Sequence, residues 1–575
     1  FGDGHQPAVD PTDPDIVYSE WQGGNLVRYD RRTGEVVYIQ PQPAADEPLE
    51  RFNWDAPILI SPHDPARLYY ASQRVFRSDD RGDSCTPVSG DLTRGLDRVT
   101  LPIMDRVLSW DSAWDLYAMS EYGTVTSLSE SPLVEGLLYA GTDDGLVQVT
   151  EDGGKTWREI DRLPGVPDGF FVNDVKADLH DADSAYVVVD DHKSGDFAPY
   201  VLKTEDRGRS WKSIAGDLPE RHVVWRIVQD HVRPELLFAG TEFGLFFTVD
   251  GGARWIELTG GVPTIPFRDL AIQTRENDLV GATFGRGFFV FDDYTPLRDV
   301  TEESLATGAT LFPVRDTLWY IPKRPLGGSA KASQGDAFFN APNPPFGAVF
   351  TVYLAEGLET RKEARRKAEK PIEAEGGDTP SPDWATLRAE KQETDPALVF
   401  TVRNAAGDVV RRLEGPTTPG FHRVAWDLRY PPHQPWTERE PTNRWLPPYA
   451  VMVEPGTYTV SVAKRVNGTF TDLGLEESFE VIPWRDPVLP GSPPAETIAF
   501  QRSIADLDRL VQGARRTLDE TAKRLGAMRT TLMRSTHDGT ALDDRVVALE
   551  RRVADLKLRL AGDSIRQESN QGGPV

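Results

Sequence analysis

The hexapeptide "DGGKTW" at Asp152–Trp157 recurs as "DRGRSW" at Asp206–Trp211 and as "DGGARW" at Asp250–Trp255. A fourth copy, "DRGDSC" at Asp80–Cys85, has cysteine in place of tryptophan. The aspartate can accept hydrogen bonds from backbone N–H groups of its own turn, and the glycine two positions later permits a positive φ. The tryptophan can pack between neighbouring sheets. We therefore interpret these aspartates as structural residues of a repeated turn, not as catalysts.

Pairs of apolar strands accompany the turns. The segments "LLYAGTDDGLVQVT", "LLFAGTEFGLFFTV" and "DLVGATFGRGFFVF" each combine an apolar strand, a glycine-containing turn and a second apolar strand. The motif aspartates recur at intervals of roughly 40–70 residues, which is typical of four-stranded blades with variable loops. We predict a mainly β fold that begins with a β-propeller. About six blades are visible between Gln6 and Asp293, as part of a seven-bladed or larger ring.

These turns, the "GTDDGL" and "GTEFGL" strands and the ending "GATFGRGFFVFDD" resemble bacterial sortilin-like proteins with Asp-box (BNR) repeats. They are also similar to Asp-box glycosidases that cleave xyloglucan with tandem propellers. The resemblance covers roughly residues 1–300, and the downstream part resembles the tails of the sortilin-like proteins. Members of this kind carry more blades before this point, so the resemblance implies missing N-terminal blades. Asp boxes indicate architecture well and activity poorly.

The rest of the chain is predicted to form three further segments. Residues 301–345 are rich in Gly, Pro and Ala and indicate a linker that includes a candidate returning strand. Residues 346–485 alternate as strands with a "NAAGD" turn and an Asn-Gly hairpin, which predicts an immunoglobulin-like sandwich with a charged insertion at about 357–395. Residues 490–575 are predicted to be a helical hairpin and a disordered tail.

The helical hairpin is predicted from two apolar stripes separated by "STHDGT". We expect helices over 496–535 and 541–561, packed antiparallel. A helix pair this short is marginal alone, so we expect it to dock on another domain or on a partner chain. The residues expected to form the contact between the helices are Leu507, Leu518, Leu525, Leu549 and Leu556.

Charge and composition exclude several classes of function. The 575-residue chain has a formal net charge of -26, and such a surface repels phosphate backbones, so we predict no nucleic-acid partner. Cys85 is the single cysteine, which excludes an intramolecular disulfide. No apolar run approaches a membrane span. The chain begins at Phe1, as expected of a fragment or of a processed, exported protein, and we predict an extracellular, periplasmic or cell-surface location.

The candidate binding residues lie where loops are expected to converge at the beginnings of the inner strands. Tryptophan next to a carboxylate suits sugar binding, because it offers a flat apolar platform and acceptors for hydroxyl groups. The alternative is that Trp54 and Trp225 pack between blades. The predicted ligand-binding residues are Trp54, Asp55, Trp110, Asp111, Asp174, Trp225, Arg226, Arg268 and Asp269, and the same loops carry His5, Asn53, Trp114 and Asn173.

A glycosidase needs two carboxyl groups roughly 6–10 Å apart if it inverts, one of them with a raised pKa. The segment "FGDGH" is placed like the segment of xyloglucan-cleaving enzymes that supplies a catalytic aspartate, so the resemblance implies Asp3. The second carboxylate of that family lies in the earlier propeller, which is absent here. We predict no cofactor and no metal site, since the cluster at 190–192 has a single histidine. A sialidase triad of Arg226, Arg268 and Arg286 is not supported by the surrounding strands.

Two functional hypotheses follow. The first is an exported, non-catalytic binding or scaffolding propeller that recognises a protein or a polysaccharide. The alternative is an Asp-box glycoside hydrolase acting on β-glucans such as xyloglucan, with part of its active site missing from this chain. Two carboxylates facing each other in an open cleft would distinguish the hydrolase.

Overall fold

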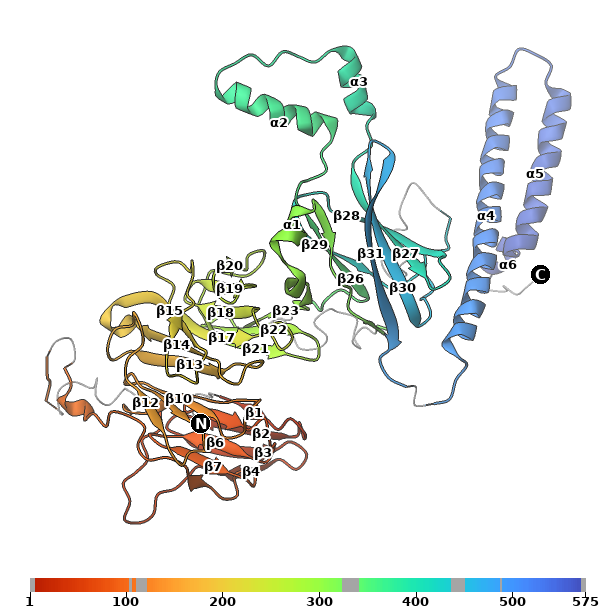
Figure 1. Ribbon diagram of the computed structural model, residues 1–575. Coiled ribbons are helices and arrows are strands. Elements are labelled where there is room, and N and C mark those ends of the chain that lie inside the picture. The colour runs from red at the N-terminus through yellow and green to blue at the C-terminus, as the bar shows by residue number, and fades with distance from the viewer. Residues whose placement is uncertain are drawn as a thin grey trace. The chain divides into compact units, whose positions relative to one another are not determined.

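The computed structural model describes residues 6–102, 106–109, 121–322, 341–435, 450–486 and 489–569. The chain divides into two compact units, Phe1–Val300 and Thr301–Val575. Each unit has hydrophobic clusters of its own. Figure 1 shows the strands of the first unit and the strands and helices of the second.

The described residues of the first unit form six antiparallel sheets that follow one another along the chain. Five have four strands, the last has three, and the strands of each sheet pair in chain order. Sheets one to three contain β1 (Ala8–Val9), β2 (Ile16–Trp21), β3 (Asn25–Asp30), β4 (Glu35–Tyr38), β5 (Ile58–Ile60), β6 (Leu68–Ala71), β7 (Val75–Ser78), β8 (Thr86–Pro87), β9 (Val125–Glu130), β10 (Leu138–Thr142), β11 (Val147–Thr150) and β12 (Arg158–Ile160). Sheets four to six contain β13 (Phe171–Ala177), β14 (Ala185–Asp191), β15 (Asp196–Thr204), β16 (Lys212–Ser213), β17 (Val224–Gln229), β18 (Leu237–Thr241), β19 (Gly244–Thr248), β20 (Ile256–Glu257), β21 (Phe267–Gln273), β22 (Asp278–Thr283) and β23 (Phe288–Phe291).

The sheets are the blades of a β-propeller, which confirms the predicted fold class. The first strand of each sheet contacts the first strand of the next, as β9 contacts β13 and β17 contacts β21. Buried clusters fill the space between consecutive sheets, so Tyr69 and Val75 of the second blade pack against Val125 and Leu138 of the third. The first three strands of the third blade are buried on both faces, and their buried residues include polar ones such as Ser127 and Gln148.

The repeated turn connects the third and fourth strands of a blade. Asp152 accepts hydrogen bonds from the backbone N–H of Thr156 at 2.9 Å and from its hydroxyl at 2.7 Å. Asp206 repeats both bonds with Ser210, and Asp80 repeats them with a serine four residues later. These hydrogen bonds, from the side chain first and then from the backbone, lower the pKa of Asp152 and Asp206 to about 2. The predicted structural role of these aspartates is confirmed.

The tryptophans of the turn reach the preceding blade. Trp255 is buried and donates from Nε1 to the carbonyl of Ile214, which directly follows β16. Trp157 donates in the same way to the carbonyl of Val88, which directly follows β8. The turns that end in Trp157 and Trp255 therefore fasten the outer ends of their blades to the blades before them.

The second unit contains two β-sheets that share one core. The sheets have the orders β24-β26-β29 and β25-β31-β30-β27-β28. Phe350 and Val352 of one sheet pack with Phe400, Val460 and other residues of the second sheet. Their elements are α1 (Glu302–Ala306), β24 (Ala309–Leu311), β25 (Thr317–Trp319), β26 (Ala348–Leu354), β27 (Ala397–Asn404), β28 (Val409–Gly415), β29 (Gly420–Trp426), β30 (Gly456–Val466) and β31 (Thr469–Pro483).

The charged insertion forms two short helices, α2 (Arg361–Ala374) and α3 (Trp384–Gln392). Thr360 and Glu363 form a capping box at the start of α2, because each side chain accepts from the other's backbone N–H. Arg365 of α2 forms an ion pair with Glu390 of α3 at 2.6 Å. Among the described residues of α2 and α3 no apolar side chain is buried. The contact described between the two helices is therefore an ion pair.

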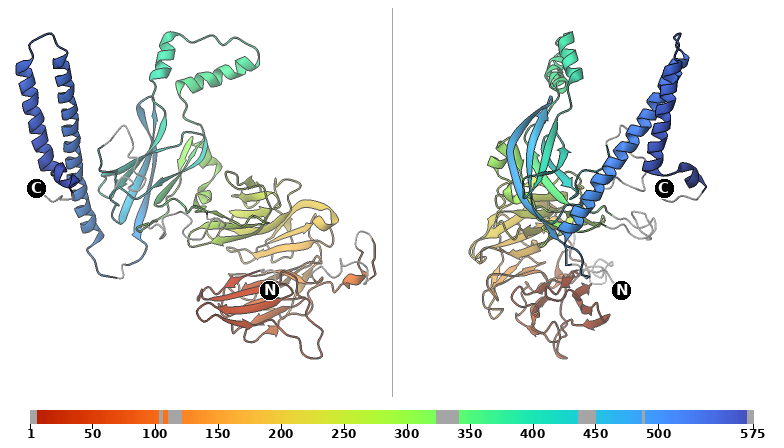
Figure 2. Two further views of the ribbon diagram at one scale, coloured as in Figure 1. Left: turned by 180° about the vertical axis from the view of Figure 1, so that it is seen from behind. Right: turned by 90° about the vertical axis from the view of Figure 1, so that its right-hand side faces the viewer.

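The chain continues into an antiparallel helix pair, α4 (Pro494–Met533) and α5 (Thr540–Ala561), followed by α6 (Ser564–Glu568). Both views of Figure 2 show α4 and α5 side by side. In α4, Ile498 and Ala505 form a buried cluster with Val451, against Trp319 and Tyr430. The N-terminal part of α4 therefore packs on residues of the same unit that precede it in the chain, in agreement with the expectation that the helix pair docks on another part of the protein.

The contact between α4 and α5 differs from the predicted one. Leu525 of α4 is 4% exposed and packs with Val546 and Val553 of α5. Leu507 is 61% exposed, and Leu549 and Leu556 are also exposed, so the prediction for these three residues was wrong. With two helices in contact, one column of residues at seven-residue spacing faces the partner helix, and the neighbouring column remains at the surface.

Candidate functional site

A β-bulge recurs near the start of the first strand in four blades. In β9, β13, β17 and β21 the register with the second strand shifts by one residue. Bulges re-aim side chains and are frequent beside functional sites. The residues at the four shifts are Thr126, Asn173, Trp225 and Arg268.

The first two of these residues connect neighbouring blades. The Thr126 hydroxyl donates to the carbonyl of Val172 at 2.7 Å, and the Asn173 side chain donates to the carbonyl of Val224 at 3.0 Å. The acceptors occupy equivalent positions in β13 and β17, so the same bond is repeated from one blade to the next. The blades are also close, because a Cβ on Gly240 would lie 2.6 Å from the carbonyl oxygen of Phe267.

Asp174 belongs to the same set of contacts between blades. Its side chain is 1% exposed, and its Oδ2 accepts from the backbone N–H of Ile227 at 3.3 Å. Its Oδ1 lies 3.4 Å from Nη1 of Arg226. The sequence marks Asp174 as a ligand-binding candidate, but these contacts give it a structural role between β13 and β17.

Trp225 is 7% exposed, and its ring is enclosed by other side chains. Its Nε1 donates to Glu242 at 3.0 Å, and the guanidinium carbon of Arg268 lies 3.6 Å from the ring centroid. The His192 ring meets it edge-on, with centroids 5.6 Å apart. Because Arg268 covers the ring, the described conformation supports the alternative of packing and offers no platform for a sugar ring.

Arg226 lies between buried and exposed carboxylates. Its Nη1 donates to the carbonyl of Asn173 at 2.6 Å, and its Nε lies 3.1 Å from Oδ1 of Asp269, whose side chain is 62% exposed. Burial by itself lowers the pKa of Arg226, but the surrounding carboxylates, among them Asp55, outweigh burial and raise it. Asp55 also interacts electrostatically with Arg268. Asp269 thus pairs with Arg226, and the charge of Asp55 acts on both Arg226 and Arg268.

Trp54 precedes Asp55 in the loop before β5 and is 40% exposed. The neighbouring Asn53 is buried, donates to the Thr124 hydroxyl at 2.8 Å and accepts from the backbone N–H of Asp55 at 3.1 Å. Asn53 thus fixes this loop against the start of β9. We call Trp54, Asp55, Arg226, Arg268 and Asp269 the strand-start site.

Several predicted residues cannot be placed. Asp3, His5, Trp110, Asp111 and Trp114 lie outside the described residues. Within the described ranges, no group of three or more His, Cys, Asp or Glu side chains is arranged to hold a metal ion. Among the helices of the same ranges, none combines the length and apolar content that a membrane span requires.

Two buried carboxyl groups near this site were not singled out from the sequence. Burial, reinforced by the charge of Asp55, raises the pKa of Glu20 to about 8, and Tyr70 donates to it at 3.2 Å. Burial also raises the pKa of Asp143 to about 6, although Thr124 donates to it from backbone and side chain. Glu20 is 2% exposed and Asp143 is 7% exposed, so neither reaches solvent. Their burial depends on packing between blades, and a local motif carries no sign of it.

The fold and the strand-start site define a β-propeller protein with a charged, tryptophan-containing site at the beginnings of its inner strands. No protein-family model matches the sequence. A segment of 209 residues, 36% of this chain, is 24% identical to the oligoxyloglucan-reducing end-specific xyloglucanase of Emericella nidulans and covers 23% of that protein. This is a distant similarity to a xyloglucanase, and the chain spans about a quarter of that relative's length.

Solved structures include further similar chains. The GH74 xyloglucanase from Xanthomonas campestris has 21% sequence identity and a TM-score of 0.36, over 52% of this chain and 45% of that chain. PorZ, a bacterial surface component of the type-IX secretion system of Porphyromonas gingivalis, has 12% identity and a TM-score of 0.37, over 83% of this chain and 51% of that chain.

Proposed function

We propose that the first unit binds a polysaccharide at the strand-start site and that the described residues do not form a complete hydrolase site. The observation that carries the proposal is the position of Trp54. It is 40% exposed and directly precedes Asp55, whose charge acts on both Arg226 and Arg268. An accessible apolar ring is thus adjacent in sequence to a carboxylate whose charge acts on two guanidinium groups.

This combination suits a sugar chain. A pyranose ring needs a flat apolar surface for its C–H groups and charged or polar groups for its hydroxyls. Trp54 supplies the surface, and the exposed carboxylate of Asp269 accepts hydrogen bonds. The guanidinium groups of Arg226 and Arg268 are donors. A binding role does not require a surface carboxyl group with a raised pKa. Among the described residues, the carboxyl groups with raised pKa values are those of Glu20 and Asp143, and both are buried.

The distant similarity to a xyloglucanase supports a polysaccharide over a protein as the ligand. We propose β-glucans of the xyloglucan type as the first ligands to test. Because such polymers lie outside the cytoplasm, the proposal includes an extracellular, periplasmic or cell-surface location. The sortilin-like, Asp-box and immunoglobulin-like assignments of the sequence belong to the same proposal.

The second candidate function is a glycoside hydrolase, and the same similarity to a xyloglucanase favours it. In this alternative Asp3 is one catalytic carboxylate and the other comes from blades outside this sequence. Scaffolding is a further part of the binding proposal, since exposed leucines such as Leu507 offer a partner chain an apolar surface on the helix pair.

Titration calorimetry of the full chain with xyloglucan oligosaccharides tests the binding proposal. Trp54→Ala should weaken binding at least about tenfold, because the apolar platform is lost. Trp384→Ala is the matched control, since Trp384 is an exposed tryptophan in α3 of the second unit. Equal affinities of the two variants, or no binding to the unchanged protein, would contradict the proposal.

A parallel assay of reducing ends separates binding from hydrolysis. We expect no release of reducing ends from xyloglucan by the chain alone. Turnover that disappears in Asp3→Asn would contradict the non-catalytic proposal and establish the hydrolase.

A further inference from the structure

The second unit contains a cavity of about 520 Å³ between the β-sheet and α4. It lies away from the strand-start site in sequence and belongs to the other compact unit. Val410 and Val451 form part of its apolar wall, and Ala505 adds to it from α4. Its volume is in the range of small-molecule sites.

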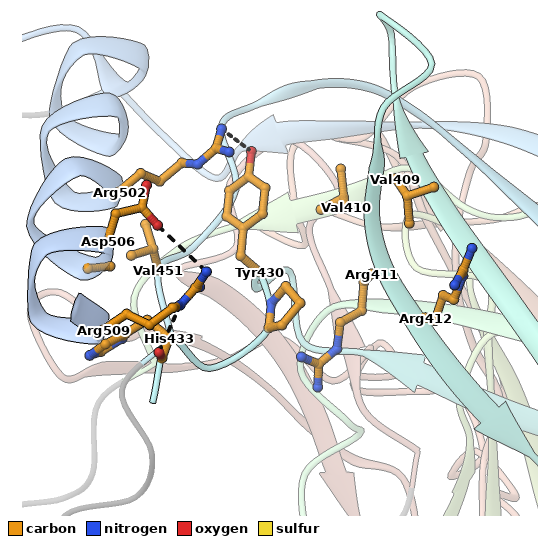
Figure 3. A pocket seen from close by; sticks show the side chains of 12 residues that line it. Val409, Val410, Arg411, Arg412, Tyr430, His433, Val451, Arg502, Asp506 and Arg509 are labelled. Carbon is orange, nitrogen blue, oxygen red and sulfur yellow. Dashed lines mark hydrogen bonds and ion pairs between the residues drawn. The ribbon is translucent and has the colours of Figure 1, made fainter. Parts of the chain in front are cut away.

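The charged lining of this cavity is basic, in a chain whose formal net charge is -26. Arg411 and Arg412 come from β28, and Arg502 and Arg509 come from α4. Asp506 is the acidic residue of the lining. Figure 3 shows the arginines of the helix and those of the strand on opposite sides of Tyr430.

The two helix arginines are held in place by neighbouring groups. The guanidinium carbon of Arg502 lies 4.5 Å from the ring centroid of Tyr430, and Arg509 donates from Nε to the carbonyl of His433 at 3.0 Å. Arg509 is also 3.8 Å from Asp506, a distance at the limit of an ion pair. These contacts leave several guanidinium N–H groups available, because each arginine has five donors.

Among the arginines that line the cavity, Arg411 gives the strongest indication of a bound anion. Its Nε is buried, and among the described residues it has no hydrogen-bond acceptor. A buried N–H of a charged group without an acceptor is costly, and an anion that accepts from Arg411 removes that cost. Other carboxylates act near the cavity, since Glu454 and Asp408 interact electrostatically with Tyr430, and His433 pairs with Asp508 at 2.7 Å.

We propose that this cavity binds a small, multiply charged oxyanion, either an organic polycarboxylate or a phosphate. Guanidinium groups recognise the oxygens of both through charge-assisted, often bidentate hydrogen bonds. The residues that carry the site are Arg411, Arg502 and Arg509.

Titration of the full chain with sodium citrate and, separately, with sodium phosphate tests the proposal at constant ionic strength. Saturable binding of citrate alone identifies a carboxylate site, and binding of phosphate alone identifies a phosphate site. Binding of both supports the shared oxyanion chemistry. Saturation by neither anion overturns the proposal.

Arg411→Gln should weaken binding of the anion at least about tenfold, because a charged donor is lost. Arg509→Gln provides a second variant, so that misfolding of one does not decide the result. The matched control is Arg515→Gln, which removes an exposed arginine of the same helix outside the cavity. If the control weakens binding as much as the two cavity variants do, the anion binds by general charge attraction and the proposal fails.

Discussion

At the scale of single residues, Glu20 has the most strongly raised pKa among the described carboxyl groups. Its carboxyl group is buried beneath the loop of Asp55, and burial and the Asp55 charge raise its pKa to about 8. An unfolded glutamate titrates near 4.3. Below that value both states are protonated and the contribution of Glu20 to stability is fully present. As pH rises towards 8 the unfolded state releases the proton first, so stability falls.

Glu20→Gln should remove this pH dependence. The variant should be more stable than the unchanged protein at pH 8, by an amount on the order of a few kcal/mol, and the difference should shrink towards pH 5. Thermal unfolding at pH 5, 6, 7 and 8 measures it. Glu159→Gln in β12, which changes an exposed glutamate, is the control. Parallel stability curves for Glu20→Gln and the unchanged protein would show that the site does not hold a proton.

Residues with local roles were predictable from the sequence, and residues with contacts between blades were not. The hydrogen bonds of Asp152 close within its own turn, so the motif contains all that is needed to predict them. Trp225 and Asp174 depend on Arg268 and on Ile227, which lie in another blade. A sequence motif places such residues at the correct strand start but does not show whether they face a ligand or a neighbouring blade.

At the scale of elements, the sequence predicts where the two helices of the pair begin and end, but not which residues lie between them. The boundaries of α4 and α5 follow from the polar break and the apolar period, and they agree with the predicted ranges within two residues. The facing residues do not follow from the period, because two adjacent columns of leucine and valine satisfy it equally. Val546 and Val553 are buried, whereas Leu549 and Leu556 are exposed.

Leu525→Ala should therefore destabilise the helix pair, while Leu507→Ala should not. Loss of a buried leucine side chain costs about 2–5 kcal/mol, and an exposed one costs within about 0.5 kcal/mol. Leu525 is 4% exposed and Leu507 is 61% exposed on the same helix. Circular dichroism at 222 nm during urea unfolding of the full chain measures the difference. A larger effect of Leu507→Ala would instead support the originally predicted contact.

At the scale of the whole molecule, two units with separate cores predict two unfolding transitions. Calorimetry of the full chain should resolve them. Asp206→Ala removes the hydrogen bonds of one turn in the first unit and should lower the stability of that unit by about 1–2 kcal/mol. The other transition should not move. Asp168→Ala, which changes an exposed aspartate between β12 and β13, is the control.

A single cooperative transition, displaced as a whole by Asp206→Ala, would contradict the division into independent units. A shift of the first transition by Asp168→Ala as large as that of Asp206→Ala would contradict the structural role of the turn.

The clusters between blades also affect how the protein folds while it is being synthesised. A blade buries one face against the blade that follows it in the sequence, as the second does against the third. Synthesis proceeds from the N-terminus at about 5–20 residues per second, so a newly made blade keeps that apolar face uncovered for several seconds. During this interval the nascent chain is open to chaperones and to aggregation. The order of the blades along the chain is therefore also the order in which their apolar faces are covered and protected from aggregation.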